Sequence, residues 1–270
     1  MTGALRYLRM YGQLARYTLV RELSFRGNFL VKVSVEVLWL GILLAFYRVV
    51  FSKTSMVAEW SEPQYLFFVG CYFAMNGLLE TLFLENCNEF SELVRKGDLD
   101  FLLLKPVDEQ FLVTCRRVDW STAPNVLMGV GVMIFSLVNM GWSFDAGRLG
   151  AFFLLFACGA LLAYAFMVLL TATGVWLVRN QSMMELWWLF SSLTRYPREI
   201  YMRVAWAEPI GQFFTFVVPF LLVVNVPAQA MVKVLDWRMV AFTVAATGVS
   251  LWVSRRFFRR ALRAYRSASS

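Results

Sequence analysis

The sequence consists mainly of apolar runs about 20 residues long, separated by short polar segments. As a helix, a run of this length crosses the roughly 30 Å hydrocarbon core of a bilayer. A helix also satisfies its own backbone hydrogen bonds, as lipid requires. Of the 270 residues, 59% are hydrophobic and 16% are charged, whereas soluble domains carry about 25% charged residues. These features predict an all-α polytopic membrane protein with one transmembrane domain over residues 1–270.

Several kinds of chemistry are missing from the sequence. It contains no histidine, which excludes HExxH zinc sites, His-ligated haem and Ser-His catalytic pairs. It also lacks the G-x-x-x-x-G-K-[ST] loop that binds nucleotide phosphates. The four cysteines have no CxxC spacing, so buried free thiols are expected. We therefore expect no catalytic residues, no metal and no cofactor bound by this chain, and no enzymatic activity of its own.

The positive charge is concentrated in three places, although the net charge is only +8. Basic residues occur before the first apolar run at 6–26, in a loop at 95–117, and after the last run at 255–266. The positive-inside rule places all three in the cytoplasm, so both termini are expected there and the number of spans is even. These charges suit topology and contact with the lipid bilayer, and no nucleic acid partner is expected.

The apolar runs predict six spans, preceded by a helix at 3–24 that lies in the membrane interface. The charged and apolar side chains of residues 3–24 fall on opposite faces of a helix, as in interfacial helices; the alternative is a soluble cytoplasmic extension. The expected spans are 28–51, 63–84, 121–140, 149–178, a fifth span with two alternatives, and 239–253.

The fifth span is ambiguous because two short apolar runs in this region are interrupted by prolines. In one topology the span is 181–200, and 201–235 forms a re-entrant element from the outside. In the other, 179–208 is a cytoplasmic interfacial segment and the span is 209–225. The positive-inside rule favours the second topology, because it places three arginines inside. These are Arg195, Arg198 and Arg203.

Few charged residues lie inside the predicted spans. Lys32 and Glu36, four residues apart near the inner end of the first span, are a candidate intramembrane ion pair. Glu80 lies near the inner end of the second span, where a solvated or arginine-paired carboxylate is favoured over a proton site.

The polar stretch at 85–118 carries the most specific pattern. Residues 88–97 have acids first, bases last and then Gly97, which predicts a short helix ended by a left-handed glycine. An apolar segment follows at 98–107, bracketed by acids and by Lys105-Pro106. Such a segment predicts a docking surface for a partner; the alternative is that it packs on the chain's own helices.

The 92–106 segment, ELVRKGDLDFLLLKP, is similar to an LVRxGxLDxLLLRP stretch in one subfamily of ABC-2 permeases, the membrane subunits of ABC transporters. Tyr196-Pro197, Val218-Pro219 and Val226-Pro227 also resemble that subfamily, and the likeness extends over essentially the whole chain. Lys105 stands where the subfamily pattern has arginine, which keeps the charge but changes the pairing geometry.

The resemblance implies an exporter subunit in the cell's inner membrane, and it favours 181–200 as the fifth span. Two permease subunits, identical or paralogous, would pair around a pathway, and separate ATPase subunits would bind ATP and Mg. The helix at 88–97 would be the coupling helix that enters the ATPase. Its expected contacts are Glu89, Glu92, Leu93, Arg95, Lys96 and Asp98.

Other functions are compatible with the same composition. A stand-alone channel or ion-coupled carrier would use Glu36 or Glu80 in its pathway. A non-transporting assembly subunit, paired with an active permease, is a further alternative. The sequence does not identify the cargo.

Overall fold

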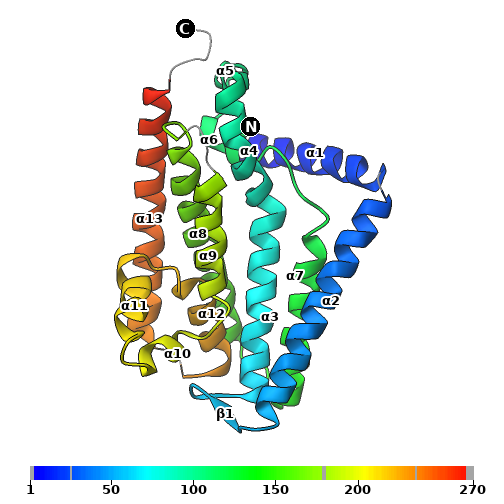
Figure 1. Ribbon diagram of the computed structural model, residues 1–270, viewed down its shortest axis with the longest axis vertical. Coiled ribbons are helices and arrows are strands. Elements are labelled where there is room, and N and C mark those ends of the chain that lie inside the picture. Colours follow the sequence, from blue (N-terminus) through cyan, green and yellow to red (C-terminus); the bar gives the residue numbers. More distant parts are fainter. Residues whose placement is uncertain (1–2, 25, 178–180, 235, 266–270) are drawn as a thin grey trace.

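The computed structural model describes residues 3–24, 26–177, 181–234 and 236–265, and these residues are almost entirely helical (Figure 1). One two-stranded hairpin is present in the described residues, formed by β1 (Met56–Val57) and β2 (Trp60–Ser61). The helices are α1 (Gly3–Ser24), α2 (Arg26–Phe51), α3 (Glu62–Leu79), α4 (Glu85–Lys96), α5 (Asp98–Leu103), α6 (Glu109–Thr114), α7 (Ala123–Asn139), α8 (Ala146–Thr173), α9 (Gln181–Leu193), α10 (Arg198–Arg203), α11 (Glu208–Gln212), α12 (Leu222–Val232) and α13 (Trp237–Ala264).

One long helix runs through the middle of the molecule and connects its two ends. It comprises α3, a π-helical turn at Glu80–Leu84, and α4, and it extends without a break from Glu62 to Lys96. It begins with a capping box at Ser61, whose backbone N–H donates to the side chain of Gln64 (3.1 Å). At 1.5 Å per residue its 35 residues span about 52 Å, so it is longer than a bilayer core is thick.

Glycines allow the helices to pack closely around this central helix. A Cβ atom on Gly129 of α7 would lie 2.4 Å from the backbone nitrogen of Ala74 in α3, closer than any packing permits. A Cβ atom on Gly159 of α8 would similarly lie 2.3 Å from the backbone oxygen of Val223 in α12. Backbones therefore lie in direct contact at these crossings, as is common between helices in membranes.

The described helices confirm an all-α polytopic membrane protein. Three of them are long and apolar enough to span a bilayer, and a fourth span is obtained if the bent pair of α11 and α12 is counted as one. The three are Phe29–Phe51, Glu62–Lys96 and Ala146–Thr173, while α7 is apolar but has 17 residues. The six spans and their boundaries remain predictions. Residues 178–180, where the predicted fourth span ends, and Arg266 lie outside the described residues.

Neither range expected for the fifth span is one straight helix. The range 181–200 contains α9 and the start of α10, separated at Pro197. The range 209–225 includes a bend of 91° between the helix Glu208–Val217 and α12, next to Pro219. Proline removes a backbone donor and clashes with the preceding turn, which accounts for both breaks.

Contacts at the hairpin end place α10 beside the hairpin. Glu199 of α10 accepts a hydrogen bond from Trp60 Nε1 (3.0 Å), and Arg203 pairs with Glu59. Figure 1 shows β1 and α10 at the end opposite to α1, α4 and α5. Arg198 and Arg203 therefore lie near the hairpin and away from the 85–118 loop, while the choice between 181–200 and 209–225 as the fifth span stays a prediction.

α1 lies crosswise to the long helices at the end that carries α4–α6 (Figure 1). The Tyr7 hydroxyl accepts from the backbone N–H of Asp108 (3.0 Å), and Trp120 Nε1 donates to the carbonyl of Ala15 (2.9 Å). These bonds attach α1 to the segment between α5 and α7, while Leu5 and Leu8 remain exposed. The helix expected at 3–24 is confirmed, and its exposed leucines suit contact with lipid.

Candidate functional site

The candidate site is the turn between α4 and α5, which we call the elbow (residues 93–104). Gly97 has a φ of 76°, and its N–H donates to the carbonyl of Val94 (3.3 Å), so it ends α4 as a left-handed cap. This confirms the predicted stop at Gly97. The residues expected to form a helix at 88–97 are helical up to Lys96 within α4, which continues the helix that begins at Glu62; their role as a coupling helix stays a prediction.

The inner face of the elbow is packed against α13. Leu99 and Leu102 are buried with Phe90 of α4 and Phe258 of α13 in one apolar cluster. Leu93 is partly buried against the same cluster. The buried cluster holds the elbow in place, and the partly buried Leu93 adds to this packing. The expected contact of Leu93 with an ATPase stays a prediction.

The outer face of the elbow is apolar and exposed. Phe101 is 69% exposed and Leu104 is 82% exposed, and the exposed Lys105 follows directly. Leu99 and Leu102 pack on the chain itself, whereas Phe101 and Leu104 do not, so the docking surface stays a prediction for the exposed pair. Large exposed apolar side chains on a rigid projection are typical of a surface that docks a partner.

Glu89, an expected ATPase contact, is instead engaged within the chain. It forms ion pairs with Arg116 and Arg117, which follow α6. Arg117 also lies 3.8 Å from Glu85. Glu89 thus joins α4 to the segment leading to α7, and its expected contact with an ATPase stays a prediction.

The remaining charged candidates lie on the exposed side of the elbow. Glu92 pairs with Arg95 (2.7 Å) and Lys96 (3.5 Å), and all three side chains are more than half exposed. Asp98 is also exposed. These ion pairs join residues three and four apart on an exposed helix face, and such solvated pairs contribute little free energy. The same groups can therefore bind a partner with little loss of stability.

The expected ion pair between Lys32 and Glu36 is not formed in the described residues. Lys32 donates to Ser121 Oγ (3.0 Å) and lies 3.9 Å from Asp119. With Arg21, Glu22 and other residues these groups line a polar pocket of about 210 Å³ between α1, α2 and α4. Lys32 of α2 therefore interacts with residues just before α7. A contact between such distant segments cannot be predicted from a four-residue spacing within one helix.

A second polar connection fixes α6 to α13. Asp108 caps α6 by accepting from the N–H of Phe111 (3.1 Å), and it also pairs with Arg255. Burial alone would raise the pKa of Asp108, but the hydrogen bonds from Arg255 and Phe111 hold that pKa below its ordinary value. Arg255 also donates to Gln110 Oε1 (2.9 Å). One arginine of α13 thus binds both the cap and the first turn of α6.

Sequence reasoning missed the position of Arg195. Its guanidinium lies 5.5 Å from the ring centre of Trp39 in α2 and 5.7 Å from that of Tyr72 in α3. Tyr72 and Trp39 lie near the middle of apolar helices, so this arginine is placed within the helix bundle rather than at its end. The proline break at Tyr196-Pro197 was the only local signal of an unusual position.

Taken together, these elements define a class: a polytopic helical membrane subunit with a rigid, exposed elbow at one end. A family model described as "ABC-2 family transporter protein" matches residues 37–269. The chain therefore belongs to the ABC-2 family and is a permease-type membrane subunit of the ABC-transporter class. No curated protein and no solved structure matches it.

Proposed function

We propose that the chain is the membrane subunit of an ATP-driven exporter, with the elbow as the docking site for an ABC ATPase. The observation that carries this proposal is the exposure of Phe101 and Leu104 at the tip of a rigid elbow. ATP and Mg would be bound by the ATPase partner. Around the apolar tip, Glu92, Arg95 and Asp98 would supply polar contacts.

The long central helix offers a direct route from the docking site into the membrane. The buried leucines of the elbow share one apolar cluster with Phe258 of α13. α4 continues without a break into α3, which packs along α7. A push on α5 by the closing ATPase would therefore tilt α3 and α13 together. Packed helices transmit such movements because well-packed interiors deform little.

The proposal includes a second permease subunit, either the same chain or a paralogue. α2 is apolar yet exposed along most of its length, with Leu30 62% and Leu38 65% exposed. Lipid covers such a face in part, and a second subunit beside α2 would complete the pathway. We propose that both termini and the elbow face the cytoplasm, with the chain in the inner membrane.

A pair of substitutions on the elbow tests the docking proposal. Phe101→Ser combined with Leu104→Ser should abolish co-purification of the ATPase and stop ATP-dependent transport, because it removes the apolar tip and leaves the buried leucines in place. Phe144→Ser is the matched control, since Phe144 is 77% exposed and lies in the turn before α8. Unchanged ATPase binding by the double variant would refute the docking site.

A proteoliposome assay separates this proposal from a stand-alone channel or carrier using Glu36 or Glu80. The purified chain alone should move no cargo without the ATPase and ATP. Flux that persists without ATP and disappears with Glu36→Gln or Glu80→Gln would favour the carrier instead.

A further inference from the structure

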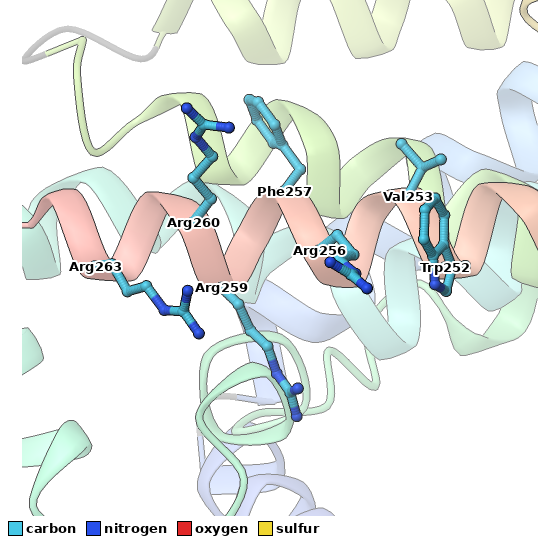
Figure 2. A pocket seen from close by; sticks show the side chains of 7 residues that line it. All are labelled: Trp252, Val253, Arg256, Phe257, Arg259, Arg260 and Arg263. Carbon is cyan, nitrogen blue, oxygen red and sulfur yellow. The ribbon is translucent and has the colours of Figure 1, made fainter.

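The last three turns of α13 carry a groove that the proposed transport mechanism does not use. It has a volume of about 760 Å³, and seven side chains line it, all from α13 (Figure 2). They recur at helical spacing and therefore share one broad face of the helix. They are Trp252, Val253, Arg256, Phe257, Arg259, Arg260 and Arg263.

The arginines of this groove form no ion pairs within the described part of the chain, although Arg259 lies close enough for its charge to act on Asp108. Arg256 stacks on Trp252 with 5.1 Å to the ring centre. Among the described residues, no ion pair involves Arg256, Arg259, Arg260 or Arg263, and the nearby Asp108 is already paired with Arg255 on a neighbouring face. The other side of α13 is buried through Ser254, Phe258 and Ala261, so the groove faces away from the protein.

The depth of the groove along α13 matches the edge of a bilayer. The last predicted span, 239–253, lies within α13. This inference rests on that predicted span: the helix from exposed Trp237 to Arg256 is about 30 Å long, the thickness of the hydrocarbon core. Arg256 to Arg263 then extends about 10 Å further, through the headgroup layer of about 5–8 Å. Val249 and Trp252 lie on the core side of the arginines, and both are 61% exposed.

We propose that this groove binds the headgroup of an anionic phospholipid. The guanidinium groups of Arg256, Arg259, Arg260 and Arg263 would bind the phosphate oxygens, because arginine pairs with phosphate through two parallel hydrogen bonds. An acyl chain would lie along Val249 and Trp252. Exposed apolar side chains lie directly beside these arginines. A lipid would cover both groups, whereas a soluble acidic partner would bind the arginines and leave the apolar side chains in water.

Native mass spectrometry of the purified chain tests this site. Detergent-solubilised protein is titrated with dioleoyl phosphatidylglycerol or with dioleoyl phosphatidylcholine, which has the same tails and no net charge. Phosphatidylglycerol should be retained preferentially, and excess inorganic phosphate should not displace it. Displacement by inorganic phosphate would show a simple anion site and overturn the lipid proposal.

The triple variant Arg256→Gln, Arg260→Gln, Arg263→Gln should weaken phosphatidylglycerol retention at least about tenfold, since each basic residue at an anionic surface contributes to binding. Arg259 is left in place because its charge also acts on Asp108. A control variant, Lys53→Gln, Arg148→Gln, Arg238→Gln, removes the same charge from other exposed positions and should retain the lipid.

Two further measurements separate loss of the lipid site from misfolding and from loss of ATPase docking. Lysine at the same three positions keeps the charge and should restore most of the retention. If the glutamine variant lost the ATPase while keeping phosphatidylglycerol, the groove would be a protein interface and the lipid site would be refuted. The lipid titration needs no ATPase, so failed docking at the elbow would leave its result intact.

Discussion

At the scale of single residues, the helix crossings depend on glycines without room for a side chain. A Cβ on Gly129 would meet the backbone nitrogen of Ala74 at 2.4 Å and the oxygen of Gly70 at 2.6 Å. Backbone atoms cannot rotate away as a flexible side chain can. Any larger residue at position 129 must therefore separate α3 from α7.

Gly129→Ala should lower the free energy of unfolding by about 1–3 kcal/mol, the usual cost of overpacking. Gly131→Ala, two residues along the same helix, is the control because nothing lies within 4 Å of its Cβ position. Thermal unfolding in detergent measures both. Equal melting temperatures for the two variants would contradict the close crossing.

The Asp108–Arg255 pair should make stability depend on pH. The folded pKa of Asp108 is below its ordinary value of about 4, so the ionised carboxylate stabilises the fold above that pH. This contribution is lost as the pH falls through the lower, folded pKa. The wild type should therefore exceed Asp108→Asn in melting temperature at neutral pH, and the difference should shrink in acid.

The control for this pH effect is Asp236→Asn at the other end of α13. Asp236 accepts a hydrogen bond from the backbone N–H of Arg238 (2.9 Å) and has no ion pair in the described residues. Its variant should show a smaller change of melting temperature with pH than Asp108→Asn. A constant difference between wild type and Asp108→Asn from neutral to acid pH would refute the assignment.

At the scale of elements, α10 and α12 are joined to the hairpin by one carboxylate. Glu199 accepts from Trp60 Nε1 (3.0 Å) and Asn225 Nδ2 (3.2 Å), and it also bonds Gln229. These are neutral donors from two different elements. Without the carboxylate, the buried Asn225 amide would lose its partner.

Glu199→Ala should therefore destabilise the hairpin end by about 1–3 kcal/mol, the cost of unsatisfied buried groups. Glu208→Ala is the matched control, because within the described part of the chain Glu208 accepts one exposed hydrogen bond, from Gln212 (2.9 Å). Unfolding in detergent, together with protease cleavage near residues 56–61, reports the loss. Identical cleavage in both variants would exclude a joining role for Glu199.

Elements with a local signal could be predicted from the sequence, whereas those set by distant contacts could not. Gly97 ends α4 as its charge pattern and residue type indicate, and the prolines break the 181–225 region as expected. The pairing of Lys32 with Ser121 and of Glu89 with Arg116 joins residues far apart in the chain. Which residues of the elbow are buried likewise depends on distant segments, because Leu99 and Leu102 share one cluster with Val113 of α6, Val168 of α8 and Phe258 of α13.

At the scale of the whole molecule, the rigid elbow at one end of the helical bundle is the proposed docking site for an ABC ATPase. The length of Glu62–Lys96 and its packing on α7 and α8 join the elbow to the bundle. Membership of the ABC-2 family supports this arrangement, because such subunits lack an ATPase site of their own.

The decisive experiment is purification of the tagged chain from its native cells in mild detergent, followed by mass spectrometry of the proteins that accompany it. We expect a stoichiometric ATPase with a phosphate-binding loop, lost with Phe101→Ser and Leu104→Ser and kept with Phe144→Ser. A second permease subunit in the same complex would distinguish a heterodimer from a homodimer. Recovery of the wild-type chain with lipid alone would contradict docking of an ATPase at the elbow.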